Sequence, residues 1–138
     1  MYKELDEYLS GFFTYDYWYD EGFQIAREML EEFSNNDWEN LLSDILSKSI
    51  DWQIRFAYCV DSDINDEAVI KSLVLLCDIE SEELFETCID SLRVIVNSEN
   101  INVISNNEII IQRVEKMLPK CGVATRRIFE DFITKVQE

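Results

Sequence analysis

Histidine is absent from this chain of 138 residues, and glycine and proline are scarce, at three and one. Without an imidazole, the sequence can form no His-dependent catalytic triad and no H-E-x-x-H zinc motif. The three glycines are isolated, so no glycine-rich phosphate loop is present. Carboxylates are so abundant that chance pairs of them carry no information. We therefore expect a protein that is not an enzyme and binds no cofactor.

Closely spaced cysteines are also lacking. The four cysteines, Cys59, Cys77, Cys88 and Cys121, are separated by 18, 11 and 33 residues. Zinc sites usually have close-spaced pairs, and disulfide frameworks are usually denser, so we expect buried free thiols, no metal site and a reducing cytosol.

One acidic segment has part of the pattern of a calcium loop. Asp61, Asp63 and Asn65 occupy its first, third and fifth positions. Asp66 stands where the loop needs glycine, and Ser72 where it needs a bidentate glutamate. We interpret the segment as a turn between two helices, capped by Asn65.

Long apolar runs are missing as well. The longest, such as Val74–Cys77, are too short to span a bilayer, and the first seven residues carry no basic or apolar signal region. The sequence therefore predicts a cytoplasmic protein without a membrane partner.

Acidic charge is what the chain has in excess. Twenty-nine Asp and Glu face twelve Lys and Arg, for a net charge of -17. A field of this sign attracts cationic partners and repels nucleic acid and anionic membranes. Residues 113–138 instead hold six bases and four acids. We expect Lys116, Lys120, Arg126 and Arg127 to pair with acids on neighbouring helices.

Helical spacing of apolar residues, with few breakers, predicts an all-α fold of about eight helices. Asn36, with Glu39 three residues on, is expected to cap the third helix. The fourth, 50–61, is apolar nearly all round, so Trp52 and Phe56 are either central in the fold or form an exposed ridge. Ile101–Ile104 is expected to be an extended part of a loop. The expected helices cover 2–11, 20–33, 36–46, 50–61, 66–77, 82–96, 108–118 and 122–138.

Two of these helices begin with a similar sequence pattern. Asp51–Ala57 and Glu82–Thr87 both begin with an acidic residue and carry apolar anchors about 30 residues apart. The pattern resembles HEAT-like repeats, in which an acidic residue, an aliphatic residue and an arginine recur as Asp51, Ile54 and Arg55 do here. The resemblance implies a short stack of antiparallel helical pairs over residues 36–138, behind an aromatic cap region at 1–35, in one domain of 1–138. An irregular helical bundle is the alternative.

Candidate binding residues come from two clusters. Glu82, Glu86 and Asp90 recur four residues apart, and like charges at that spacing destabilise a helix. Their presence therefore indicates a partner-binding face, and a solvated face of the helix is the alternative. The resemblance implies that such second helices line a concave surface. Aromatic residues crowd positions 12–19 and cannot all point inward, so they either cap the core or anchor an interface. The predicted partner-binding residues are Tyr15, Asp16, Tyr17, Trp18, Tyr19, Asp51, Asp61, Asp63, Glu82, Glu83, Glu86 and Asp90.

In overall character the chain resembles the immunity proteins of bacterial toxin systems. That resemblance implies a stoichiometric inhibitor that binds a basic toxin domain, a nuclease, one to one, as in contact-dependent growth inhibition. An acidic secretion chaperone or adaptor, a nucleic-acid mimic and a repeat scaffold are the alternatives.

Overall fold

The computed structural model describes residues 1–137, apart from the side chain of Asp66. Every regular element in this part of the chain is helical, which confirms the all-α prediction. The elements are α1 (Tyr2–Leu9), α2 (Tyr15–Tyr17), the π-helical turn η1 (Trp18–Gly22), α3 (Phe23–Glu31), α4 (Asn35–Asp44), the 3-10 turn η2 (Ile45–Ser47), α5 (Ile50–Cys59), α6 (Asp66–Leu76), α7 (Glu82–Ile95), α8 (Ile101–Ser105), α9 (Glu108–Met117) and α10 (Val123–Gln137).

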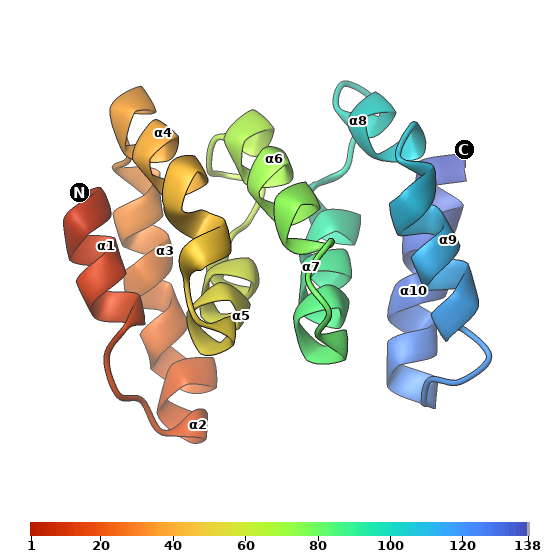
Figure 1. The fold of residues 1–138 in the computed structure, drawn as a ribbon, viewed down its shortest axis with the longest axis horizontal. Coiled ribbons are helices and arrows are strands. Elements are labelled where there is room, and N and C mark those ends of the chain that lie inside the picture. The colour runs from red at the N-terminus through yellow and green to blue at the C-terminus, as the bar shows by residue number, and fades with distance from the viewer. Residues whose placement is uncertain (138) are drawn as a thin grey trace.

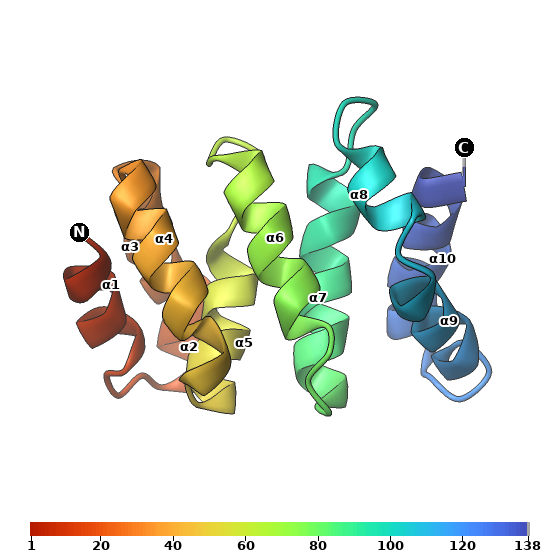
Figure 2. The same ribbon diagram turned by 45° about the horizontal axis from the view of Figure 1, so that its top comes forward.

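The long helices form a row of antiparallel pairs with the two ends of the chain at opposite ends of the row (Figure 1). Helices α1, α4, α6 and α9 make one layer, and α3, α5, α7 and α10 make the other (Figures 1 and 2). Within the second layer, α5 packs against α3 and α7, and α7 packs against α10. The predicted stack of helical pairs is therefore present, and it begins with α1 and α3, ahead of residue 36.

Polar caps set most of the helix starts. Asn65, Ser81 and Asn107 accept hydrogen bonds from backbone N–H groups of the first turns of α6, α7 and α9, which confirms the cap predicted at Asn65. Asn36 is not a cap, and that prediction was wrong.

The cap of α4 is Ser34, in a capping box with Asp37. Both Ser34 and Asn36 have an acidic residue three positions on, and an aromatic contact distinguishes them. Phe33, just before the cap, packs edge-on against Trp38 at 5.0 Å between ring centroids. These are the two positions of a hydrophobic staple, and they select the earlier start.

The segment Ile101–Ile104 is helical, not an extended loop as expected, and forms most of α8. The side chain of Asn97 accepts hydrogen bonds from the backbone N–H groups of Glu99 and Asn100, which builds a tight turn just before the helix. Ile104 is fully buried. Tertiary burial and this local turn thus outweigh the β-branched character of the segment.

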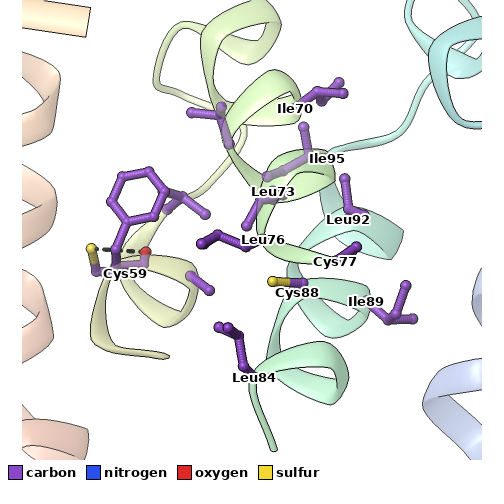
Figure 3. Close-up of a cluster of buried hydrophobic side chains, with 14 of the residues drawn as sticks. Cys59, Ile70, Leu73, Leu76, Cys77, Leu84, Cys88, Ile89, Leu92 and Ile95 are labelled. Atoms are coloured by element: carbon purple, nitrogen blue, oxygen red, sulfur yellow. Dashed lines mark hydrogen bonds between the residues drawn. The ribbon is translucent and has the colours of Figure 1, made fainter. Parts of the chain in front are cut away.

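The core runs continuously through the row and includes Trp52 and Phe56, both buried, so α5 is central and carries no exposed ridge of these two residues. Cys59, Cys77 and Cys88 are buried free thiols, as expected, and Cys121 is half-buried (Figure 3). Burial raises the pKa of Cys59 to about 12. Burial, together with a hydrogen bond to Cys77, raises the pKa of Cys88 as well. Among residues 1–137, no helix is both long and apolar enough to cross a bilayer.

Candidate protein-interaction face

Four aromatic rings form a continuous row along the second layer. Tyr15 packs against Tyr19 at 4.5 Å between ring centroids, Tyr19 against Tyr58 at 4.6 Å, and Tyr58 against Phe23 at 5.4 Å. We call this set the tyrosine row. It joins α2 and η1 to α3 and α5, so residues 43 positions apart in the sequence form one surface.

A π-helical turn sets the position of the row. Thr14 caps α2 by accepting a hydrogen bond from the backbone N–H of Tyr17, and the chain then passes through η1 into α3. Gly22, at the end of η1, is buried beneath aromatic rings, where an added Cβ would lie 3.0 Å from Trp18 and 3.1 Å from Tyr17. The hydroxyl of Tyr8 donates to the Gly22 carbonyl at 3.0 Å. Burial and its proximity to Tyr17 raise the pKa of Tyr8 to about 12, so this donor stays protonated.

The first hollow lies at the Tyr15 end of the row and has a volume of about 220 Å³. Tyr15, Tyr19 and Trp18 supply aromatic walls, and Asp51 and Glu83 supply carboxylates. Phe13, Thr14, Ile54 and Arg55 complete its lining.

The second hollow is next to the first, because Tyr19, which lines the first, packs against Tyr58, which lines the second. It has a volume of about 320 Å³. Its lining is Phe23, Arg27, Tyr58, Val60, Asp61, Thr87, Asp90, Ser91 and Val94.

The two arginines on this face are hydrogen-bonded to backbone carbonyls within the protein. The guanidinium of Arg55 donates to the carbonyls of Leu9 and Gly11 at 2.8 Å each, and lies over the Phe13 ring at 4.8 Å. Arg27 donates to the Cys59 carbonyl at 2.8 Å and pairs with Asp61 at 3.3 Å. Each arginine thereby satisfies carbonyl groups at the end of a neighbouring helix, α1 or α5.

Asp51 and Glu83, in contrast, have no ion pair and no side-chain hydrogen bond with any residue in the described part of the chain. Burial of the phenol raises the pKa of Tyr19, and the neighbouring Tyr15 and Glu83 raise it further. The carboxylate charge in the first hollow is therefore available to a cation from outside.

The structure brings together seven of the twelve predicted residues around the two hollows. Tyr15, Trp18, Tyr19, Asp51 and Glu83 line the first, and Asp61 and Asp90 line the second. Asp16, Tyr17 and Asp63 are exposed outside both.

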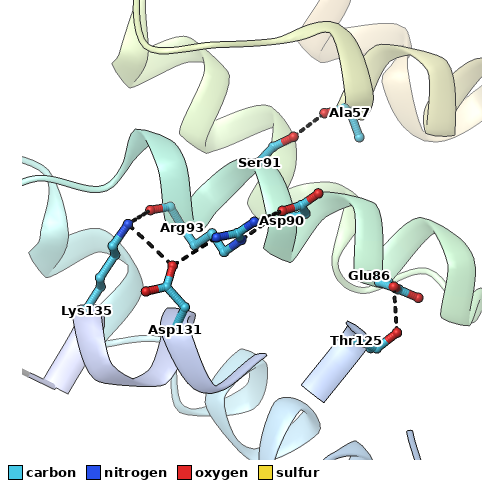
Figure 4. Close-up of polar contacts among 8 residues, drawn as sticks. All are labelled: Ala57, Glu86, Asp90, Ser91, Arg93, Thr125, Asp131 and Lys135. Atoms are coloured by element: carbon cyan, nitrogen blue, oxygen red, sulfur yellow. Dashed lines mark hydrogen bonds and ion pairs between the residues drawn. The ribbon is translucent and has the colours of Figure 1, made fainter. Parts of the chain in front are cut away.

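Glu82 and Glu86 face elsewhere. Glu82 lines a hollow on the other side of α7, beside α9. Glu86 accepts a hydrogen bond from the Thr125 hydroxyl at 2.7 Å, which joins α7 to α10 (Figure 4). The acidic stripe of α7 is thus divided among three environments.

Asp90 belongs to a second contact between α7 and α10. Arg93 binds Asp90 at 2.7 Å and Asp131 at 3.1 Å, and Lys135 binds Asp131 at 3.5 Å (Figure 4). The hydrogen bond from Arg93, more than any other contact, lowers the pKa of Asp131. Burial alone would lower the pKa of Arg93, but hydrogen bonds to Asp131 and Asp90 outweigh it and raise that pKa.

The basic C-terminal residues do not form the ion pairs that we expected. Within residues 1–137, Lys116, Lys120, Arg126 and Arg127 have no acidic partner within 4.0 Å. The α7–α10 seam uses Arg93 and Lys135 for this purpose. Lys116 and Lys120 line the same hollow as Glu82.

Sequence reasoning missed Tyr58 and Phe12. Tyr58 follows Asp51 and Arg55 at helical spacing on one face of α5, which was a usable signal. Phe12 belongs to the recognised aromatic cluster and is 92% exposed, in the loop before α2. Its neighbour Phe13 packs against the side chains of Tyr8, Tyr17, Trp18 and Arg55. Nothing in the local sequence indicates which of the two phenylalanines is exposed.

Among the described residues, no group of three or more Cys, Asp or Glu side chains could hold a metal ion. The face offers aromatic rings, carboxylates and a few exposed apolar groups. Comparison with known proteins finds no matching family model, no matching curated sequence and no matching solved structure.

Proposed function

We propose that this chain is a stoichiometric protein inhibitor, an immunity protein that binds a basic toxin domain one to one through the tyrosine row and its two hollows. One observation carries the proposal: in the first hollow, exposed Tyr15 and half-buried Tyr19 lie beside Asp51 and Glu83, which form no ion pair with the described residues, while the arginines of the same face are bound to helix ends. The combination gives fast electrostatic encounter together with aromatic anchors that slow dissociation.

A nuclease is the toxin that fits best. Its active cleft must be cationic to hold nucleic acid, and acidic side chains can occupy the positions of phosphates along such a cleft. With a net charge of -17, the chain itself is repelled by nucleic acid and attracted to that cleft. Association should therefore weaken steeply as salt is raised, and dissociation should change less.

The test is co-expression of the chain with the product of the gene directly upstream of its own, followed by measurement of growth and nucleic-acid cleavage. We expect growth to be restored and cleavage to stop at one equivalent of the chain. Killing despite abundant folded protein would rule out the immunity function, and stabilisation of the client without loss of its activity would establish a secretion chaperone instead.

A matched pair of variants locates the interface. Tyr15 is 76% exposed at the rim of the first hollow, and Ile109 is 70% exposed on α9 in the other layer. Neither truncation to alanine should change stability by more than about 0.5 kcal/mol. Tyr15→Ala should weaken toxin binding by about thirtyfold or more, as for an interface hot spot, and Ile109→Ala should leave it unchanged. Equal effects of the two variants would place the interface elsewhere.

A further inference from the structure

We propose that the first hollow receives an arginine side chain of the partner, with its guanidinium between the rings of Tyr15 and Tyr19 and the carboxylates of Asp51 and Glu83. This inference rests on the proposed function for the existence of a protein partner. It deepens that function by naming the chemical group that is recognised.

Charge selects a cation. Two carboxylates and one guanidinium, that of Arg55, line the first hollow, and the Arg55 guanidinium is directed to the carbonyls of Leu9 and Gly11. The unpaired carboxylates come from different helices, Asp51 from α5 and Glu83 from α7. A cation held by both carboxylates would join the two helices and neutralise their charge, which a bound water would not do.

Shape and donor geometry select arginine over lysine. The Tyr15 and Tyr19 rings, tilted at 48° to each other, both line the hollow. A guanidinium is planar, stacks on aromatic faces, is weakly hydrated and carries five donors in a fixed fork. An ammonium ion is compact and strongly hydrated, so it loses more on entering an aromatic site.

The same segment already holds a guanidinium in this manner. Arg55 lies over the rings of Phe13, at 4.8 Å, and Trp18, at 6.0 Å, while donating to two oxygens. The first hollow repeats these components, rings and oxygen acceptors, on its open side.

An unsatisfied donor indicates that the arginine comes on a peptide chain. Trp18 lines the first hollow and is 3% exposed, and its indole N–H has no hydrogen-bond partner in the described part of the chain. A buried donor without a partner is costly, so it favours a ligand whose acceptor reaches the indole N–H once the rings that cover it shift aside. The backbone carbonyl of a peptide-borne arginine is such an acceptor, whereas a guanidinium alone has none.

The probe is N-acetyl-arginine methylamide, titrated into the full chain and followed by the indole N–H resonance of Trp18 in ¹⁵N–¹H NMR spectra. Two analogues separate the contributions: the lysine compound keeps the charge without the plane, and the citrulline compound keeps the plane without the charge. We expect saturable shifts of the Trp18 resonance with the arginine compound, weaker binding by the lysine compound and none by the citrulline compound.

Adjacent glutamates provide the control. Glu82 and Glu83 are both exposed in the first turn of α7, and only Glu83 lines the first hollow. Both Glu→Gln variants remove one charge, so they have the same effect on net charge and nearly the same effect on the α7 dipole. Glu83→Gln should weaken binding of the arginine compound by about tenfold, equivalent to about 1.4 kcal/mol, and Glu82→Gln should leave its binding unchanged.

Unfolding midpoints measured for both variants exclude loss of fold as the cause. An unmoved Trp18 resonance, equal binding of the lysine compound, or equal effects of the two variants would overturn the arginine assignment. None of these outcomes depends on toxin neutralisation, which is scored separately by growth, so the two proposals can fail independently.

Discussion

At the scale of single residues, four of the twelve cations, Arg27, Arg55, Arg113 and Lys135, bind carbonyl groups at helix ends. Arg113 of α9 donates to the carbonyls of Cys77 and Ile79, just past the end of α6, at 2.7 and 3.1 Å, and lies 4.2 Å above the Phe85 ring. Lys135 similarly donates to the Arg93 carbonyl in the last turn of α7. These contacts satisfy acceptors that a helix leaves unpaired and interact favourably with its dipole.

Replacing Arg113 should therefore destabilise the fold. Arg113→Met keeps much of the aliphatic packing and removes both hydrogen bonds, so we expect the free energy of unfolding in urea to fall by about 2–3 kcal/mol. Arg126→Met is the control, because Arg126 is exposed and has no ion pair in residues 1–137. Its effect should stay within about 0.5 kcal/mol. Equal losses of unfolding free energy in the two variants would mean that removal of a positive charge, and not loss of the contacts at the helix end, destabilises the fold.

The buried thiols predict sensitivity to alkali. The pKa of Cys59 is raised from 9.0 to about 12, so above pH 9 the unfolded chain loses a proton that the folded chain keeps. The contribution of the buried thiol to the free energy of unfolding is fully present below pH 9. As the pH rises towards 12, the free energy of unfolding should fall by about 1.4 kcal/mol per pH unit for each such thiol. Unfolding in urea with a reductant at pH 8, 9.5 and 10.5 would measure the slope. Cys59→Ala should make it shallower, and an unchanged slope would refute this origin.

At the scale of elements, the π-helical turn η1 decides whether the tyrosine row forms. Gly22→Ala should gain about 1 kcal/mol from helix propensity, but an added methyl group 3.0 Å from Trp18 and 3.1 Å from Tyr17 over-packs the site at a cost of about 1–3 kcal/mol. We expect a net loss of stability and weaker binding of the arginine probe. In Gly122→Ala the added methyl group meets nothing within 4 Å, so thermal unfolding should be unchanged or slightly improved. Better stability in Gly22→Ala would show that the rings can move aside.

Sequence reasoning succeeded where one local signal was sufficient. The helical class, the cap at Asn65, and the buried thiols follow from side-chain type and spacing. It failed for α4 and α8, where an aromatic staple and the burial of Ile104 decided the outcome. These two contacts become visible only once the chain is folded.

The candidate site was predicted in part, for the same reason. Clustered aromatics and carboxylates were visible in the sequence, but the partners of each carboxylate were not. Glu86 binds Thr125 in α10, 39 positions away, and Glu83, three residues earlier, lines the first hollow. Helical spacing gives the direction of each side chain around α7 and says nothing about what lies opposite.

At the scale of the whole molecule, uncompensated charge opposes compactness. Only part of the 29 acidic residues can pair with 12 cations, and several of those cations bind carbonyls instead. Repulsion among the remaining carboxylates should be screened by salt, whose Debye length falls from about 30 Å at 0.01 M to about 8 Å at 0.15 M.

We therefore expect the thermal unfolding midpoint to rise between 0.01 and 0.5 M NaCl. The few ion pairs of the α7–α10 seam lose strength under the same conditions, and they are too exposed to reverse the trend. Calorimetry at constant pH, with KCl as the matched salt, would measure the shift. A midpoint that falls with salt would show that the ion pairs outweigh the repulsion.

Under the proposed function, the tyrosine row would also determine which basic proteins the chain does not bind. Any polyanion in a cell attracts cationic proteins, and long-range attraction alone does not discriminate among them. Rings packed against one another, edge to face at Tyr58 and tilted at Tyr15, present a fixed surface that a flexible acidic tail cannot. Selectivity is thus a property of the folded shape, and a mismatched cationic surface would be drawn in by charge and then released because it cannot fit the rings.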